Sequence, residues 1–158
     1  IEAAQAESAT TRDINAIVQS FAHAEQLMVS SAIEFSVATF KIHTMYCPVP
    51  SYVIATSTDG QGDFIWANQP WYDLHGIDEV QARSGQFWSC IHPDDRAAVR
   101  LASDGAASRR VMFSVDYRLV NHKTGVVKKV HAQALPLVPH TVKDGDQVLY
   151  LGAILVDD

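Results

Sequence analysis

The sequence of 158 residues predicts an α+β protein, in which a five-stranded antiparallel sheet carries short helices on one side and follows a long N-terminal helix. Three observations lead to this fold class. Residues 11–47 contain no glycine or proline, which is typical of one long helix. Residues 109–121 alternate apolar and polar side chains, as a half-buried strand does. The last three expected strands are joined by turns too short for crossover helices, so they pair antiparallel.

Composition excludes several classes of partner. The chain has 12 Lys and Arg against 18 Asp and Glu, a formal net charge of −6, whereas nucleic-acid binding requires clustered basic residues. No window approaches the roughly 18 consecutive apolar residues of a membrane-spanning helix, and the first residues lack the pattern of a signal peptide. Two cysteines are too few for a disulfide framework. We therefore expect a cytoplasmic domain that contacts neither nucleic acid nor membrane.

The long helix carries a heptad pattern that favours self-association. Large apolar residues occupy every a position and mostly small residues occupy d, so that two copies can approach closely. The expected homodimer interface consists of Ile14, Ile17, Phe21, Ala24, Met28, Phe35, Ala38 and Ile42. In the second half, Ile33, Val37 and Phe40 form another apolar face, which we expect to pack on the following domain. The alternative is a single amphipathic helix packed on its own domain.

Pro48 and Pro50 end this helix, because proline cannot continue a helix and restricts the residue before it. The remaining elements follow from alternation and from turn residues. We predict strands at 52–56 and 64–68, short helices at 69–77 and within 84–107, and strands at 109–121, 126–135 and 147–156. Turns at 58–63, 122–125 and 143–146 connect the strands.

Several short motifs then occur in a fixed order along residues 49–157. They are FIWAN at 64–68, WYDLHGI at 71–77, FW at 87–88, IHPDDR at 91–96, DYRL at 116–119, KTG at 123–125, ALPL at 134–137, YLG at 150–152 and VD at 156–157. Together they resemble a PAS domain of the subfamily with a His-Pro-Asp-Asp-Arg signature. The resemblance implies that residues 48–158 are a PAS sensory domain and that residues 1–47 are a signalling and dimerisation helix.

PAS domains as a class sense small ligands or cofactors between sheet and helices, or dimerise and relay movement to an attached domain. The resemblance therefore implies part of a larger signal-transduction protein, such as a sensor histidine kinase, a cyclase or a transcription regulator, with its output domain outside this chain. The sequence leaves two functions open. One is sensing of a small ligand, relayed through the helix and the dimer interface. The other is a ligand-free dimerisation and protein-interaction module.

For the first function, an unidentified small organic molecule is the expected ligand, held in a mostly apolar pocket with one or two polar contacts. The candidate pocket residues are Trp66, Tyr72, Phe87, Trp88, Ser89, His92, Met112, Phe113, Tyr117 and Leu151. The alternative is that the aromatic residues among them only fill the core. The His-Pro-Asp-Asp stretch also has a structural interpretation, because Asp94 and Asp95 follow a proline and suit a helix N-terminus.

No enzymatic, metal or haem site is expected. Haem-binding PAS domains carry a histidine on the helix before the long third strand, whereas residues 98–108 contain none. A haem-binding gas or redox sensor is therefore a less favoured function, with His92 or His75 as the best available ligands and His43 behind them. Cys90 lies outside the cysteine motif of flavin-binding light sensors and is interpreted as a small core residue. Cys90, His92 and Asp94 are too poorly spaced for a catalytic set. The histidines lack the paired spacing of a zinc site.

Overall fold

The computed structural model describes residues 2–56, 62–137 and 147–157, and within the first helix it describes the side chains of residues 12–24, 27, 28 and 31 onward. Two of the predicted turns therefore lie wholly or mostly outside the described residues, namely 58–61 and 143–146. The chain divides into two compact units, residues up to Ser36 and residues from Val37 onward, and each is described by itself.

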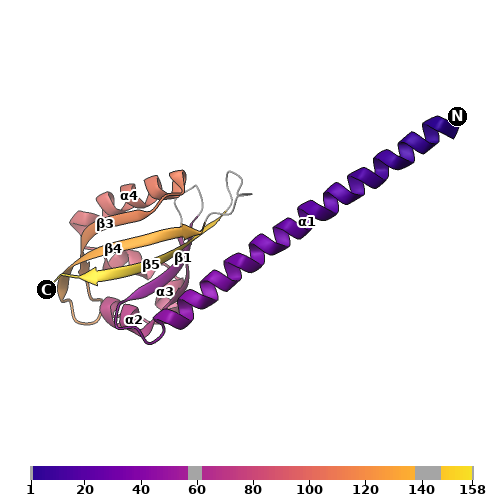
Figure 1. The fold of residues 1–158 in the computed structure, drawn as a ribbon. Coiled ribbons are helices and arrows are strands. Elements are labelled where there is room, and N and C mark those ends of the chain that lie inside the picture. Colours follow the sequence, from indigo (N-terminus) through magenta and orange to yellow (C-terminus); the bar gives the residue numbers. More distant parts are fainter. Residues whose placement is uncertain (1, 57–61, 138–146, 158) are drawn as a thin grey trace. The chain divides into compact units, whose positions relative to one another are not determined.

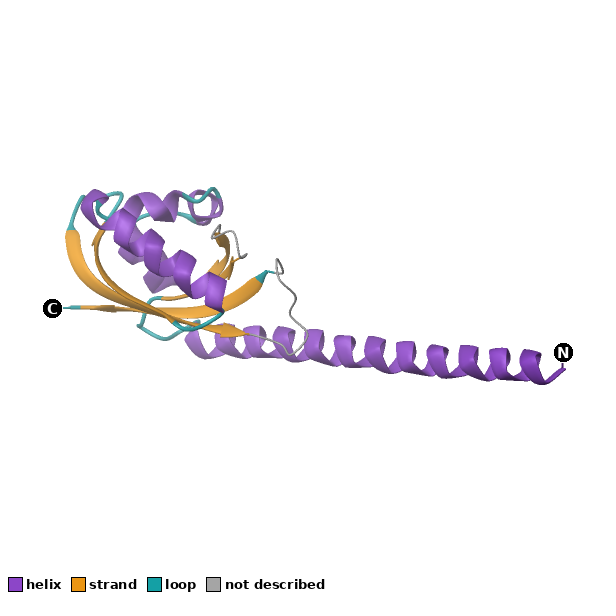
Figure 2. Ribbon diagram, turned by 90° about the horizontal axis from the view of Figure 1, so that it is seen from above, coloured by secondary structure: helices purple, strands orange, loops and turns teal. Residues whose placement is uncertain are grey.

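The second unit contains an antiparallel sheet with helices on one face (Figure 1, Figure 2). Its strands are β1 (Ser51–Thr56), β2 (Gly62–Ala67), β3 (Phe113–Val120), β4 (Val127–Leu137) and β5 (Val148–Val156), and its helical segments are α2 (Gln69–His75), α3 (Glu79–Arg83), η1 (Gln86–Cys90), η2 (Pro93–Asp95) and α4 (Arg96–Arg109). The strand order is β2-β1-β5-β4-β3, and all neighbours are antiparallel. The predicted fold class is confirmed.

The central pair of strands, β1 and β5, brings the start of one next to the end of the other. Ser51 pairs with Ala153, and the N–H of Ile154 donates to the carbonyl of Pro50 at 2.9 Å. The chain therefore enters β1 beside the place where it leaves β5.

The long helix α1 spans Glu2–Thr44, so it begins well before residue 11 and ends ahead of the two prolines, as predicted. The hydroxyl of Thr44 donates to the carbonyl of Phe40 at 2.7 Å within the last turn. Phe40 packs edge-on against Trp66 of β2, with ring centroids 6.4 Å apart. The end of α1 therefore contacts the sheet through Phe40, one residue of the second apolar face.

Two details of the predicted secondary structure are wrong for local reasons, the start of β3 and the absence of α3. The strand expected at 109–121 begins only at Phe113, because α4 continues to Arg109 and Arg110 then adopts a left-handed φ of 54°. Helix α3 was not predicted from the sequence. It is stabilised by a capping box in which the side chains of Asp78 and Gln81 each accept from the other residue's backbone N–H.

Candidate functional site

The inner face of the sheet is hollow at its centre because the middle strands carry small residues there. Ala132 and Ala134 of β4 line this space, and Gly152 of β5 pairs with Ala134. Tyr52 of β1 pairs with Gly152 on the other side, and its ring lies so close that a Cβ at position 152 would overlap it. Gly152 thus lets the Tyr52 ring lie against the sheet, and the alanines leave an open space beside it.

Aromatic side chains from the helices cover this space. Trp71 and His75 come from α2, and Phe87 and Trp88 come from η1. Trp71 stacks on His75 with ring centroids 3.9 Å apart, and its ring lies 6.4 Å from that of Phe87. A cavity of about 80 Å³, measured as the volume open to the centre of a water-sized sphere, remains between sheet and helices. One water molecule needs about 10–15 Å³ on this measure, so the cavity has room for a small organic molecule.

Residues with unpaired hydroxyl groups line this largely apolar space. The Oγ1 of Thr56 makes no hydrogen bond, but it is almost completely inaccessible to solvent. Within the described residues, the hydroxyls of Tyr52 and Tyr117 make none either, whereas the hydroxyl of Tyr150 bonds to the carbonyl of Val111 at 2.9 Å. Burial raises the pKa of both Tyr52 and Tyr117 far above that of an ordinary phenol, so both stay protonated. The cavity therefore offers hydrogen-bond donors that the protein does not use.

His75 contributes an acceptor. It is 4% exposed, and its Nδ1 lies 2.8 Å from the carbonyl oxygen of Trp71 one turn earlier in α2. Because a carbonyl only accepts, Nδ1 carries the proton of the neutral ring and Nε2 keeps its lone pair. Burial lowers the pKa of His75 to about 4, so the imidazole is neutral at physiological pH.

Charged groups are excluded from the cavity. Among the described residues that line it there is no Asp, Glu, Lys or Arg. The nearby thiol of Cys90 is 2% exposed and donates to the carbonyl of His75 at 3.6 Å. Burial raises the pKa of this thiol to about 11, so it is a protonated core group and not a nucleophile.

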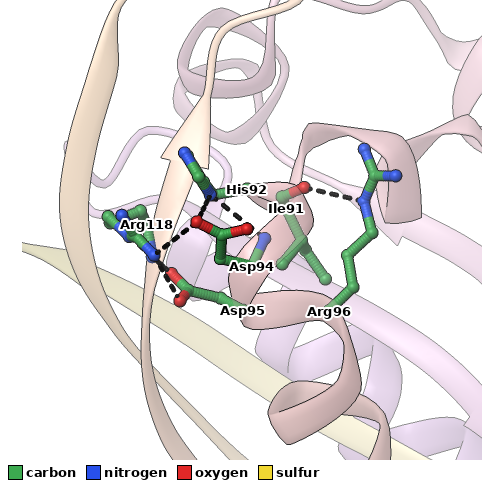
Figure 3. Close-up of polar contacts among 6 residues, drawn as sticks. All are labelled: Ile91, His92, Asp94, Asp95, Arg96 and Arg118. Atoms are coloured by element: carbon green, nitrogen blue, oxygen red, sulfur yellow. Dashed lines mark hydrogen bonds and ion pairs between the residues drawn. The ribbon is translucent and has the colours of Figure 1, made fainter.

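An ion pair fixes the helices to the edge of the sheet next to the cavity (Figure 3). Asp95 accepts from the Nε and Nη2 of Arg118 at 2.9 and 2.8 Å, and from the backbone N–H of the same residue at 2.8 Å. The N–H of His92 donates to the Arg118 carbonyl at 2.9 Å. Arg96 donates to the carbonyl of Ile91 at 2.9 Å. The signature thus ties η2 and the start of α4 to β3.

The helix N-terminus expected at the signature is present, because Asp94 and Asp95 lie in the first turn of η2, but neither carboxylate caps a helix. Asp95 stands at the N-cap of α4, but its side chain makes no capping bond because it is engaged by Arg118. The cap of η2 is His92, whose Nδ1 accepts from the N–H of Asp94 at 3.2 Å. His92 is therefore structural and lies outside the cavity.

Asp95→Asn is expected to lower the melting temperature at neutral pH, because an amide forms no ion pair with Arg118. The bonds from Arg118 lower the pKa of Asp95 strongly. A carboxyl with a depressed pKa stabilises the fold above its unfolded value of about 3.9, and this contribution is lost as the pH falls below that value. The variant should therefore lose less stability than the wild type between pH 4 and pH 2 in urea titrations.

Asp94→Asn is the matched control for this variant. The Asp94 side chain is 78% exposed and lies 4.0 Å from Arg118, so replacing Asp94 should change the melting temperature little. Equal effects of the two substitutions would contradict the assigned role of Asp95.

A buried amide connects α2 with the end of α1. The Oδ1 of Asn68 accepts from the N–H groups of Ser51 and Trp71, at 2.9 and 3.2 Å. Its Nδ2 donates to the carbonyls of Thr44 and Val49, both at 2.9 Å. Asn68 is 3% exposed and is the N-cap of α2, the helix that carries Trp71 and His75 into the cavity. One side chain thus joins the last residue of α1, the start of β1 and the cavity helix.

The sequence-predicted pocket residues divide into three groups. Phe87, Trp88, Phe113 and Tyr117 line the cavity as predicted. The expectation is wrong for Trp66 and Leu151, because both lie opposite Val53, on the outer face of the sheet.

The remaining predicted residues lie beside the cavity without lining it. Tyr72 packs edge-on against Trp71 at 5.3 Å. Ser89 is exposed and donates its hydroxyl to the carbonyl of Gln86 at 2.6 Å. Met112 is 49% exposed ahead of β3.

Sequence reasoning missed the residues that give the cavity its polarity. Tyr52 and Thr56 share the inner face of β1 through their even spacing, a period-2 signal that was present in the sequence. His75 was considered only as a haem ligand. Its spacing of four residues from Trp71 places both on one side of α2, and this was the available signal.

The predicted dimer residues of α1 are exposed wherever their side chains are described. Phe21, Met28 and Phe35 are each 73% exposed, and Ile42 is 70% exposed. Ile14 and Ile17 are exposed by 55% and 56%. Ala24 and Ala38 are exposed as well. The apolar a and d positions therefore form an unpartnered stripe on the helix.

A serine, a histidine and an aspartate adjoin one another on the outer face of the sheet. The Nε2 of His131 lies 3.3 Å from Ser114 Oγ, and its Nδ1 lies 2.6 Å from Asp116 Oδ1. The Asp116 side chain is 83% exposed, so water surrounds the group. Catalysis of acyl transfer requires preorganised donors in a water-excluded site, and this arrangement does not provide one.

The described residues form neither a membrane-spanning helix nor a cluster of metal ligands. No helix within them has the length and hydropathy needed to cross a membrane. No three His, Cys, Asp or Glu side chains in the described part of the chain are grouped so as to hold a metal ion.

Comparison with known proteins places the sheet and helices in a recognised family. A family model described as PAS fold matches residues 64–152. No curated protein matches the sequence.

Solved structures share the fold at low sequence identity. A domain of a putative light and redox sensing histidine kinase from Haloarcula marismortui is 17% identical, with a TM-score of 0.53, covering 73% of this chain and 97% of its own. A PAS domain from Colwellia psychrerythraea is 14% identical, with a TM-score of 0.55 and coverage of 73% and 94%. The LOV protein of Rhodobacter sphaeroides is 15% identical, with a TM-score of 0.59 and coverage of 78% and 67%. At these identities the similarity concerns the fold alone.

Proposed function

The chain belongs to the PAS fold family, and from this premise we propose that it is the sensory module of a larger signal-transduction protein that binds a small organic molecule in its cavity. One observation carries the proposal: a cavity of about 80 Å³ lined by Tyr52, Tyr117 and His75, whose hydroxyls and Nε2 have no hydrogen-bond partner among the described residues. Buried polar groups are ordinarily hydrogen-bonded, so leaving the two tyrosine hydroxyls unpaired costs stability unless a bound molecule or water satisfies them.

The proposed relay runs from the cavity to α1 through α2. A ligand that contacts Trp71 or His75 touches the same short helix that Asn68 caps, and Asn68 also holds the carbonyl of Thr44. A ligand shifts an equilibrium only as far as its affinities for the two states differ. In this proposal those states differ in how α2 and the end of α1 are held together at Asn68.

The proposed setting is cytoplasmic, in a homodimer, with a kinase, cyclase or transcription-regulating output. The domain of a putative sensing histidine kinase that shares this fold supports the signalling role. Catalysis is not part of the proposal, since the buried Cys90 thiol remains protonated and the cavity contains no charged group.

The test combines native mass spectrometry of freshly purified protein with a thermal-shift screen of small organic molecules. We expect a bound mass or a stabilising compound for the wild type, because a ligand that binds only the folded state raises its stability. Ala132→Leu fills the cavity and should abolish the effect. A compound that stabilises both proteins equally, or a screen without any stabilising compound, would reject the cavity as the sensing site.

A second candidate function, a ligand-free dimerisation module, is favoured by the exposed apolar stripe of α1. Phe21→Glu combined with Phe35→Glu should weaken a dimer more than about 100-fold, because each change buries a charge in an apolar seam. Analytical ultracentrifugation measures the effect. Gln19→Glu combined with Ala22→Glu adds the same charge outside the a and d positions and should leave dimerisation intact. A wild-type chain that sediments as a monomer at high concentration would exclude this function.

A further inference from the structure

The polar groups of the cavity include two tyrosine hydroxyls, which can donate and accept, and an imidazole nitrogen, which only accepts, and none of these groups is charged. Tyr52 and Tyr117 offer hydroxyl donors, and His75 offers the lone pair of Nε2. Resting on the proposed sensory function, we propose that the cavity selects a neutral, flat organic molecule that donates a hydrogen bond to His75 and accepts one from a tyrosine hydroxyl. His75 is the residue that determines this specificity.

Neutrality of the ligand follows from what surrounds the cavity. The described lining residues include no Asp, Glu, Lys or Arg, and His75 is neutral, so a charged ligand would be desolvated without an ion pair. The nearest ion pair of the signature, Asp95 with Arg118, is closed on itself through two side-chain bonds and cannot serve a ligand. An ammonium or carboxylate is therefore disfavoured.

The requirement for a donor follows from His75. Its Nδ1 proton is held by the Trp71 carbonyl at 2.8 Å, and its stacking on Trp71 at 3.9 Å fixes the plane of the ring. Nε2 is consequently a preoriented acceptor that needs an O–H or N–H partner. An acceptor on the ligand engages the hydroxyl proton of Tyr52 or Tyr117, both of which stay protonated and line the cavity.

The flat shape follows from the walls. The indole of Trp71 and the rings of Phe87, Trp88, Phe113 and Tyr117 all line the cavity, and aromatic faces and edges pack best against another ring. The two alanines of β4 leave room on the side of the sheet. A single substituted ring has the shape that these surfaces complement.

The test uses four probes of nearly equal size: phenol, toluene, benzoate and benzylammonium. Binding to the full chain at pH 7 is measured by protein-observed NMR titration. We expect phenol to bind about tenfold more tightly than toluene, since one buried hydrogen bond accounts for roughly that factor. Benzoate and benzylammonium should bind more than about 100-fold more weakly than phenol, because the cavity does not compensate their charge.

Three variants assign the effect to residues. His75→Phe keeps the stacked ring but removes the acceptor, so the affinity for phenol should fall to that for toluene while toluene is unaffected. His75→Gln keeps an acceptor and should restore part of the preference for phenol. Ala132→Leu should abolish binding of both probes by filling the space.

The outcomes separate this inference from the proposed function. Equal binding of phenol and toluene, binding of either ion as tight as that of phenol, or a phenol affinity unchanged in His75→Phe would overturn the inference. Absence of binding by all four probes would overturn it as well, whereas the proposed function is decided by the compound screen on wild type and Ala132→Leu.

Discussion

Acidification from about pH 6.5 to pH 4 is expected to lower the free energy of unfolding by about 3 kcal/mol through His75 alone, since one pKa unit corresponds to about 1.36 kcal/mol. The pKa of this buried imidazole is about 4 in the folded chain, against 6.5 for the ordinary side chain. Between these values the unfolded state takes up a proton that the folded state does not, so stability falls as the pH falls. Above pH 6.5 and below pH 4, His75 does not contribute to the pH dependence of the free energy of unfolding.

The side chains that contact His75 do not titrate between pH 4 and pH 6.5. Trp71 stacks on the ring and does not ionise. The Cys90 thiol that bonds to the His75 carbonyl has its pKa raised to about 11 and is neutral throughout. His122 approaches only through its backbone N–H, at 2.8 Å from the same carbonyl.

Urea denaturation at intervals of half a pH unit measures the effect. His75→Phe and His75→Gln should both flatten the curve between pH 4 and 6.5, because neither side chain titrates. Asp95→Asn should leave the fall in the free energy of unfolding between pH 6.5 and pH 4 unchanged and should alter only the fall below pH 4. A wild-type curve that is level from pH 6.5 to pH 4 would show that His75 is not buried as a neutral ring.

Replacement of Asn68 should have an effect of similar size. Asn68→Ala removes four hydrogen bonds, two from the N–H groups of Ser51 and Trp71 and two to the carbonyls of Thr44 and Val49. The Trp71 N–H and the two part-buried carbonyls each keep another partner at 3.0–3.2 Å, so the main costs are the buried N–H of Ser51 and the lost cap of α2. An unpaired buried group costs about 1–3 kcal/mol and a lost cap about 0.5–2 kcal/mol. We expect a loss of about 2–4 kcal/mol in denaturant titrations, which is in the upper range for a single substitution.

Asn68→Asp separates the two halves of this hydrogen-bond set. An aspartate still accepts from Ser51 and caps α2, but its second oxygen faces the carbonyls of Thr44 and Val49 and cannot donate to them. Hydrogen exchange should therefore accelerate in residues 37–49 while α2 stays protected. Gln69→Ala is the control, because its side chain is exposed and bonds only to Asp73. Equal exchange in α2 and in residues 37–49 would reject Asn68 as the junction between them.

The sheet could be predicted from sequence because alternation, glycine turns and prolines act locally. The site could be predicted only in part, and Trp66 shows why. Phe64 and Trp66 are two residues apart and would share a face in a regular strand. Phe64 pairs with Ile54 and Trp66 pairs with Val53, so Ile65 is an extra residue and the ladder is irregular there. This irregularity turns Trp66 outward to Phe40, and it depends on the partner strand, which the local sequence does not specify.

Leu151 illustrates a different limit. Strand β5 is apolar on both faces, so alternation does not indicate which set of residues faces the helices. The burial of Tyr150, Gly152 and Ile154 on the inner side is set by their neighbours in β1 and β4. The partners of Asn68 and Asp95 likewise lie far away along the chain, and tertiary contacts of this kind have no periodic signal.

The start of β1 and the end of β5 lie side by side at one end of the sheet. The residues before Pro50 and after Val156 therefore leave the sheet next to each other. A slide of β5 along β1 by one residue would turn every side chain of β5 to the other face of the sheet and would break its register with β4. The two ladders of β5 therefore fix the spacing between the residues that enter β1 and those that leave β5.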